Sequence, residues 1–354
     1  MRGLLDFAAA SVALSFRYMK AIRTDRELEC PQIDAGLRSR GVNLITLAEG
    51  VDEETLAAEV VDADLLLMCY TPITTRVLQA ATRLRGIVKY GVGIDAIDID
   101  AARARRIPVV NIPEYAEQTV AEGAFALMIS LARKLGPLHR EMQLSGWAWP
   151  TREWMGQDLA GKTLGLAGVG RIGRRLARMA GPGFGMRVLG FDPFVSRDVM
   201  SRHAVEKCDS LAALLREADF VSLHVVLNSQ TRHLIGRAEL EQMKPSAILI
   251  NVSRGALVDE PALLDALLSG RLSGAGLDVY SQEPLTPSGH PLSPLLTLPN
   301  VMLMPHLTFY TREAMERLER ETLERCDELL AGQPLLVKSH DPRLREQAHG
   351  VRFA

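Results

Sequence analysis

Residues 163–192 read TLGLAGVGRIGRRLARMAGPGFGMRVLGFD, and this stretch decides the fold. An apolar run that predicts a strand, Thr163–Ala167, leads directly into the pattern GVGRIG at Gly168–Gly173, which opens a helical stretch. In this setting the first glycine permits a tight turn, the second lets a diphosphate approach the backbone, and the third lets the helix pack on the strand. A second predicted strand, Arg187–Phe191, follows. The stretch therefore predicts a βαβ unit that binds an anion at the N-terminus of its helix.

An acidic residue at the end of the second strand indicates which dinucleotide is bound. Asp192 lies 19 positions after Gly173, close to the spacing at which a carboxylate accepts the ribose hydroxyls of NAD and repels a 2′-phosphate. No basic residue follows until Arg197. The alternative, a glycine turn followed by an unrelated Asp-Pro turn, does not explain the strand, the helix and the acid together. We predict an NAD site.

The same rhythm of short apolar runs and amphipathic stretches extends over most of the chain. Alternating strands and helices predict parallel sheets, and 354 residues suit two domains better than one. The fold class is therefore α/β, with two doubly wound parallel-sheet domains. The further predicted strands are Met19–Ile22, Asn43–Leu47, Asp64–Met68, Gly86–Tyr90, Pro108–Asn111, Phe220–Val225, Ala247–Asn251, Gly276–Val279 and Val301–Met304. The longest predicted helices are Gln118–Arg140 and Thr311–Leu330.

Composition and charge argue against several classes of protein. The chain is 47% hydrophobic and 24% charged with a net charge of −2, and its basic residues are scattered. This gives no footprint for nucleic acid and no polybasic patch for a membrane surface. The four cysteines lie far apart and no metal-ligand spacing occurs, so we expect reduced thiols, no metal site and a cytoplasmic protein.

The first 18 residues stand apart from this pattern. They are apolar with Arg2 near the start, which resembles a signal peptide, but Asp6 interrupts them and no small-residue cleavage site follows. We interpret residues 1–18 as an N-terminal extension, either disordered or upstream of a usual start at Met19. No other segment approaches the roughly 20 apolar residues of a membrane span.

Three polar residues follow predicted strands in the second half of the chain. Arg254 follows AILIN, Glu283 follows GLDV, and His306 follows VMLM. Ligands of doubly wound sheets bind beyond the carboxyl ends of strands. A guanidinium binds a carboxylate bidentately, an imidazole exchanges protons near neutral pH, and a carboxylate beside it keeps it protonated for reduction. A surface arginine, a packed loop histidine and an exposed loop carboxylate are the structural alternatives.

The combined motifs carry a specific resemblance. The segments are GVGRIG, FDP, NVSRGALVDE, GLDVYSQEP and MPH in that order, preceded by KYGVGIDAIDIDAARARRIPVVNIP and AEQTVAE. Together they resemble the D-isomer-specific 2-hydroxyacid dehydrogenase family over residues 20–335. The resemblance implies a Rossmann-type NAD-binding domain (116–305) inserted into a flavodoxin-like substrate-binding domain (19–115 and 306–340). The polar residues that follow predict a loosely held tail (341–354). The resemblance also implies an active site in the cleft between the two domains.

The resemblance implies roles for individual residues. Arg254 would bind the substrate carboxylate and carbonyl, His306 would be the acid/base, and Glu283 would be its partner. The Val92 and Gly93 amides and the loop at Tyr70 would contact the substrate. The expected cofactor contacts are Gly168, Gly170, Arg171, Ile172, Gly173, Asp192, Val225, Thr231, Val252 and Asp278, the last on the nicotinamide side. Family members are usually homodimers that pair through the cofactor domain, and the Gln118–Arg140 helix is the expected contact.

Departures from the family pattern bear on the substrate. Phe309 and Tyr310 stand where many members have small residues, and the Tyr70 loop lacks an arginine for a phosphate, although Arg76 or Arg152 could serve. We therefore expect an NAD-dependent 2-keto acid reductase for glyoxylate, hydroxypyruvate or a bulkier apolar acid rather than 3-phosphoglycerate. Glutamate at 283 argues against formate dehydrogenase.

Two other classes of function compete with this prediction. An NAD(H)-sensing interaction protein, similar to the corepressors of this fold, would keep the same three residues, but we see no long disordered or basic flank for a partner. An NAD-binding module without redox activity would leave Arg254, Glu283 and His306 unexplained. NADH-dependent capture of a partner would favour the sensing protein.

Overall fold

A computed structural model describes residues 18–354, and the predicted extension lies, except for Tyr18, outside the described residues. The described residues form two compact units, one of residues 18–115 with Met315–Ala354 and one of Ala116–Ala314. The prediction of two doubly wound parallel-sheet domains, one inserted into the other, is confirmed. The second unit extends to Ala314, and the backbone after His306 is hydrogen-bonded to Asp278 within it. The domain boundaries expected from the sequence stay a prediction.

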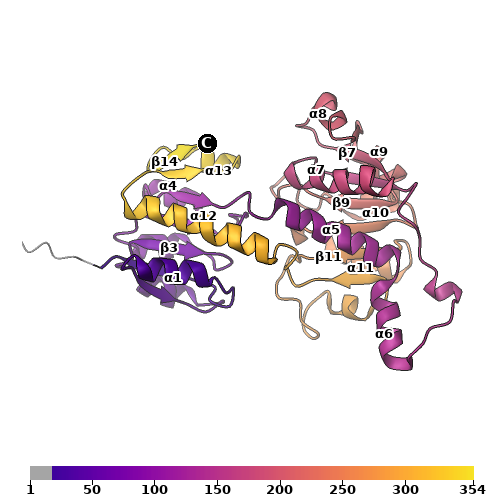
Figure 1. Ribbon diagram of the computed structural model, residues 1–354, viewed down its shortest axis with the longest axis horizontal. Helices are drawn as coiled ribbons and strands as arrows, with labels where there is room; N and C mark the ends of the chain where they lie inside the picture. Colours follow the sequence, from indigo (N-terminus) through magenta and orange to yellow (C-terminus); the bar gives the residue numbers. More distant parts are fainter. Residues whose placement is uncertain (1–17) are drawn as a thin grey trace, which may run out of the picture. The chain divides into compact units, whose positions relative to one another are not determined.

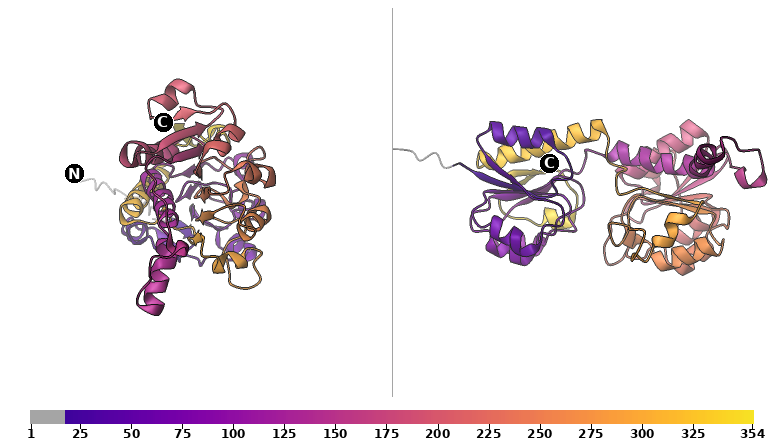
Figure 2. Two further views of the ribbon diagram at one scale, coloured as in Figure 1. Left: turned by 90° about the vertical axis from the view of Figure 1, so that its right-hand side faces the viewer. Right: turned by 90° about the horizontal axis from the view of Figure 1, so that it is seen from below.

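The first unit is built on a five-stranded parallel sheet in the order β2-β1-β3-β4-β5. This is the flavodoxin-like order, whose ligand position lies at the carboxyl ends of β1 and β3. Helices cover both faces of the sheet (Figures 1 and 2). The strands are β1 Lys20–Arg23, β2 Asn43–Thr46, β3 Leu65–Met68, β4 Gly86–Lys89 and β5 Val109–Asn111. The helices are α1 Pro31–Ser39, α2 Glu53–Glu59, α3 Thr75–Ala80, α4 Ile99–Ala104 and, from Met315 onward, α12 Arg312–Leu330.

The predicted loose tail instead folds onto the first unit. A short parallel pair, β13 (Leu335–Val337) and β14 (Val351–Phe353), flanks the helix α13 (Pro342–Arg345). Gln347 is buried, and its side-chain amide accepts from the backbone N–H of Val109 at 2.7 Å and donates to the carbonyl of Val109 at 2.9 Å. The tail thereby satisfies the backbone of the edge strand β5, a contact that local polarity does not reveal.

The second unit is a seven-stranded parallel sheet in the order β12-β11-β10-β9-β6-β7-β8. The strand order reverses between β6 and β9, as in a dinucleotide-binding Rossmann fold. Its strands are β6 Thr163–Ala167, β7 Arg187–Phe191, β8 Glu206–Lys207, β9 Phe220–Leu223, β10 Ile248–Asn251, β11 Gly274–Leu277 and β12 Val301–Leu303. Its helices are α5 Glu117–Ala132, α6 Leu135–Ser145, α7 Arg171–Arg178, α8 Arg197–Ser201, α9 Leu211–Glu217, α10 Arg237–Gln242 and α11 Glu260–Leu268.

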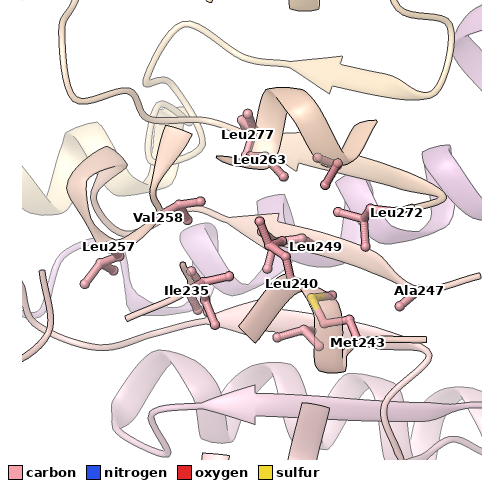
Figure 3. Close-up of a cluster of buried hydrophobic side chains, with 14 of the residues drawn as sticks. Ile235, Leu240, Met243, Ala247, Leu249, Leu257, Val258, Leu263, Leu272 and Leu277 are labelled. Atoms are coloured by element: carbon pink, nitrogen blue, oxygen red, sulfur yellow. The ribbon is translucent and has the colours of Figure 1, made fainter. Parts of the chain in front are cut away.

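Two apolar layers hold this sheet, because successive side chains of a strand point to opposite faces. Leu249 of β10 packs with side chains from α10 and α11 (Figure 3), whereas Ile248 and Ile250 pack on the other face with α5 and α7. Both faces are thus covered, as a parallel sheet requires. The layers leave the carboxyl ends of the strands as the part of the sheet that can carry polar loops.

The helix predicted at Gln118–Arg140 is interrupted. It divides into α5 and α6 at Lys134, whose φ of 51° lies in the left-handed region. A non-glycine residue there ends a regular helix. The apolar periodicity continues across the break, so the sequence pattern did not show it. No helix within residues 18–354 combines the length and apolarity needed to span a bilayer.

Candidate active site

The glycine pattern after β6 forms the turn that the sequence predicts. Gly168 has a φ of 93°, and a side chain there would collide with the carbonyl oxygen of His224. A Cβ at Gly173 would lie 2.5 Å from the carbonyl oxygen of Gly168, so α7 can begin this close to the turn only without a side chain. Both glycines are therefore required by contacts within the protein itself.

Gly170 differs from the other two glycines. It is exposed, and nothing lies within 4 Å of the position its Cβ would take. It precedes α7, whose first turn has no side-chain cap. An open space at an uncapped helix N-terminus suits a diphosphate, whose oxygens would accept from the free N–H groups. Arg171, the first residue of α7, pairs with Glu117 at 3.3 Å, and Ile172 packs partly buried under the turn.

Asp192 lies against the glycine turn. One carboxylate oxygen accepts from the N–H of Val169 at 3.0 Å, and the other accepts from the N–H of Phe194 at 2.9 Å. The carboxylate is thus held in place at the end of β7 while remaining partly exposed. This is the position from which an acid can reach a ribose bound beside the turn.

The remaining predicted cofactor residues lie on the other side of the turn. Val225 is half-buried, and its side chain would touch a Cβ placed on Gly168. The hydroxyl of Thr231 donates to the carbonyl of Val226 at 2.7 Å and closes the loop after β9. Val252 is buried under the loop that carries Arg254.

Arg254 is carried by a braced loop after β10. The side-chain amide of Asn251 donates to the carbonyl of Arg254 at 2.8 Å, and its oxygen accepts from the N–H of Ser253 at 3.1 Å. A side chain on Gly255 would collide with the backbone of Tyr280. The loop of Arg254 is therefore pressed against the segment that leads to Glu283.

Glu283 and His306 are hydrogen-bonded to each other. Glu283 Oε2 lies 2.9 Å from His306 Nδ1, and the other oxygen accepts from the N–H of Tyr280 at 3.0 Å. Burial tends to raise the pKa of Glu283, but these bonds and the charges of His306 and Arg254 outweigh it and hold the pKa below its usual range. The three predicted residues thus come together at the carboxyl ends of β10, β11 and β12.

His306 stands in a strained conformation that Asp278 supports. Its φ is 58°, uncommon for a residue with a side chain. Asp278 is 1% exposed and accepts from the N–H of Leu307 at 2.8 Å and of Thr308 at 3.1 Å. Burial raises the pKa of Asp278, while its bonds to Thr308 and Leu307 oppose that shift. The carboxylate fixes the backbone behind the histidine; its expected place beside nicotinamide remains a prediction.

Comparison with known proteins agrees with this geometry. Residues 125–308 match the family model of the D-isomer specific 2-hydroxyacid dehydrogenase, NAD binding domain. The chain is 40% identical over 298 residues to a glyoxylate reductase of Korarchaeum cryptofilum, covering 83% of this chain and 88% of that protein. It is 38% identical over 293 residues to a D-3-phosphoglycerate dehydrogenase of Methanocaldococcus jannaschii, covering 82% of this chain and 54% of that one.

A solved structure gives the same result. D-lactate dehydrogenase from Aquifex aeolicus, complexed with NAD and lactic acid, superposes with a TM-score of 0.78 at 30% identity, covering 88% of this chain and 96% of that chain. The chain belongs to the D-isomer specific 2-hydroxyacid dehydrogenase family. It carries the NAD-binding domain of that family, and the predicted cofactor, NAD, is confirmed. The chain spans about half the length of the curated D-3-phosphoglycerate dehydrogenases that it matches.

Sequence reasoning missed one residue that holds the segment of His306 in place. The hydroxyl of Tyr280 donates to the carbonyl of Met304 at 3.0 Å, which ties the end of β11 to the strand end before His306. Burial raises the pKa of this phenol well above its ordinary value. A tyrosine after GLDV gave no signal, because its partner lies 24 residues away along the chain.

A second missed residue organises the predicted substrate loop of the first unit. Asp25 is 1% exposed and has a φ of 57°. Its carboxylate accepts from the N–H groups of Cys69 at 2.7 Å, Tyr70 at 3.0 Å and Thr71 at 3.0 Å. The loop after β3 is therefore fixed by a side chain from the loop after β1. The described residues contain no group of His, Cys, Asp and Glu that could hold a metal ion.

Proposed function

We propose that the protein is an NAD-dependent dehydrogenase that interconverts a D-2-hydroxy acid and its 2-keto acid. The observation that carries the proposal is the pairing of His306 with Glu283 at 2.9 Å beside the loop of Arg254, in the domain that carries the NAD cradle. NAD supplies the hydride acceptor, and NADH the donor, when bound. The protein must then hold the acid and move one proton.

Each of the three residues has a distinct part in the proposed reaction. The Arg254 guanidinium binds the substrate carboxylate and polarises the carbonyl, which favours charge developing on its oxygen. His306 donates a proton from Nε2 to that oxygen during reduction and removes it during oxidation. Glu283 holds Nδ1, so that Nε2 faces the substrate, and stabilises the imidazolium.

The substrate class that we propose is a small 2-keto acid without a phosphate. A curated relative of similar length is a glyoxylate reductase, whereas the phosphoglycerate dehydrogenases extend well beyond the matched region. Phe309 is 8% exposed and makes an edge contact with Tyr310, with ring centroids 5.9 Å apart. An apolar pair so close in sequence to His306 favours an aliphatic substituent on the acid.

We also propose that the protein is a homodimer that pairs through the cofactor domain. The helix α6 buries none of its residues, and the segment after it exposes large apolar side chains. Leu144 is 78% exposed and Trp149 is 75% exposed. Monomeric proteins seldom leave such side chains together in water. Sedimentation of the protein beside a Leu144→Arg/Trp149→Arg variant tests the pairing, and a monomeric wild type would contradict it.

The test of the activity is NADH oxidation against a panel of 2-keto acids, with His306→Gln and Arg254→Ala beside the wild type. We expect turnover of at least one acid, with kcat lowered by about 10²–10⁴ in His306→Gln and NADH affinity unchanged. Arg254→Ala should raise KM and lower kcat together, since it removes both binding and polarisation. Tight NADH binding without turnover of any acid would contradict the proposal and favour the NAD(H)-sensing protein.

A further inference from the structure

One buried cation of the first unit has no counter-charge. Lys89 is the last residue of β4 and is 6% exposed. Its ammonium donates to the carbonyl of Cys69 at 2.6 Å and contacts the Cys69 sulfur at 3.2 Å. Within residues 18–354 it forms no ion pair. A buried lysine in a folded protein normally has an anionic partner, because an unpaired charge in a low-dielectric interior destabilises the fold.

The carboxylate that shares this neighbourhood is already committed elsewhere. Asp25 accepts from the N–H groups and hydroxyl of the loop after β3 and from the hydroxyl of Thr24 at 2.6 Å. It thereby supports the same loop that Lys89 approaches through Cys69. Asp25 keeps its negative charge in these bonds but forms no ion pair with Lys89, so among the described residues no carboxylate lies within 4 Å of the ammonium.

The ammonium lies beside the turn that follows β4. A Cβ on Gly91, whose φ is 152°, would come within 2.7 Å of Lys89 Nζ, so the chain passes closely over the charge. The Val92 carbonyl accepts from the side-chain amide of Asn111 at 2.6 Å. Among the described residues, the N–H groups of Val92 and Gly93 donate no hydrogen bond. Val92 is 46% exposed, so its free donor sits on an accessible turn.

The aromatic ring of Tyr70, in the predicted substrate loop, also lies near the Lys89 ammonium. Lys89 Nζ lies 5.5 Å from the ring centroid of Tyr70, a cation–π distance. The charge therefore contacts the loop after β3 and the turn after β4. The loop follows β3, one of the two strands at whose carboxyl ends ligands of a flavodoxin-like sheet bind, and the turn follows the neighbouring strand β4.

We propose that Lys89 is a positioning and specificity residue for an anionic substrate. Its buried charge attracts the carboxylate of the 2-keto acid to the Val92–Gly93 amides, and the carboxylate supplies the missing counter-charge. This rests on the proposed dehydrogenase function and deepens it. Lys89 would act through the turn and the loop rather than by touching the reacting carbonyl, so it selects acids over uncharged analogues.

The experiment compares the best 2-keto acid of the panel with its methyl ester, for wild type and Lys89→Met. Removal of the charge should lower the ratio of kcat/KM for acid over ester by about tenfold or more, mainly through KM of the acid. NADH affinity should stay unchanged. Lys89→Arg keeps a positive charge and should therefore retain most of the wild-type ratio of kcat/KM for acid over ester. Cys69→Ala removes the thiol contact but keeps the charge, so it should leave the ratio as in wild type.

The outcomes separate this inference from the proposed function. An unchanged ratio of kcat/KM for acid over ester in Lys89→Met would overturn the inference. Equal losses for acid and ester would then indicate a merely structural role, and no loss for either would indicate no role. In both cases, turnover by the wild type would still support the dehydrogenase. If wild type turns over no acid and binds no oxamate in the presence of NADH, both proposals fall. Lys89→Gln, which can still donate to the Cys69 carbonyl, replaces Lys89→Met if that variant does not fold.

Discussion

The glycine turn at Gly168–Gly173 and the proposed acid–base segment at Pro305–Thr308 lie in the same unit but are built differently. The turn is formed by backbone: Gly168 and Gly173 permit close contacts, and Gly170 leaves an open space. The acid–base segment is made by side chains from elsewhere, since Asp278 holds the amides after His306 and Glu283 holds its ring. A backbone site tolerates few substitutions within itself, whereas a side-chain site depends on residues remote in sequence.

The largest expected effect is the difference between alanine substitutions at two glycines of the turn, Gly168 and Gly170. Gly168→Ala forces a side chain into a left-handed conformation and against the carbonyl of His224, so we expect about 2–5 kcal/mol of lost stability and a large loss of NADH affinity. Gly170→Ala meets nothing within 4 Å, so its melting temperature should match wild type while NADH binds at least tenfold more weakly. Thermal unfolding and fluorescence titration with NADH give both values.

The matched pair also shows what would break the comparison. Wild-type NADH affinity in Gly170→Ala would mean that the diphosphate does not approach this turn. A stable Gly168→Ala protein would mean that the backbone of the turn can relax, and that the glycine there is not required by its neighbours.

A change in the proposed acid–base segment should lower kcat and leave NADH affinity nearly unchanged, the opposite of a change in the glycine turn. Asp278→Asn places an amide where a carboxylate accepted from Leu307 and Thr308, so one of these bonds is replaced by two donors facing each other. Hydrogen bonds to a charged group contribute roughly 1.5–3 kcal/mol, so we expect kcat to fall by about tenfold or more as His306 loses its orientation. Steady-state kinetics at saturating NADH measure kcat, and NADH affinity should be nearly unchanged. Thr308→Val, which removes only the hydroxyl, should have a smaller effect; a tenfold loss of NADH affinity in Asp278→Asn would place Asp278 in the cofactor site instead.

The same contrast explains how much the sequence could predict. The roles of Gly168, Gly170 and Gly173 follow from a local pattern, and so does the proximity of Arg254, Glu283 and His306, because parallel strands end at one edge. The contacts that hold the His306 segment do not follow from a local pattern, since the hydroxyl of Tyr280 donates to the carbonyl of Met304, 24 residues away along the chain.

Long-range contacts also account for the errors in the fold. Gln347 pairs with Val109 from a distance of 238 residues, so a polar tail looked loose. The helix break at Lys134 arises from a backbone conformation that apolar periodicity does not encode. Propensity and pattern describe one segment at a time, and these features belong to pairs of segments.

A smaller effect should follow from neutralising Asp192. Its carboxylate is fixed by the amides of Val169 and Phe194, so Asn can keep part of this bonding while losing the charge that repels a 2′-phosphate. Wild type should prefer NADH over NADPH, and Asp192→Asn should lower the ratio of kcat/KM values by about tenfold. Initial rates with each cofactor measure it. Equal turnover of both cofactors by wild type would contradict the assigned role.

The smallest effect concerns the histidine beneath the glycine turn, which tests how tightly the backbone site is packed. Burial lowers the pKa of His224 from 6.5 to about 4, while its Nε2 lies 2.9 Å from the hydroxyl of Ser222. As pH falls below 6.5, the unfolded chain takes up a proton there and the folded protein does not until about pH 4, so stability is lost across this window and is unaffected above it. His224→Gln cannot take up this proton, so its melting temperature should fall less steeply from pH 6.5 to about pH 5, by the equivalent of about 1–2 kcal/mol. Parallel melting curves for the two proteins would show that the ring is protonated in the folded state, and that the packing behind Gly168 admits a charge.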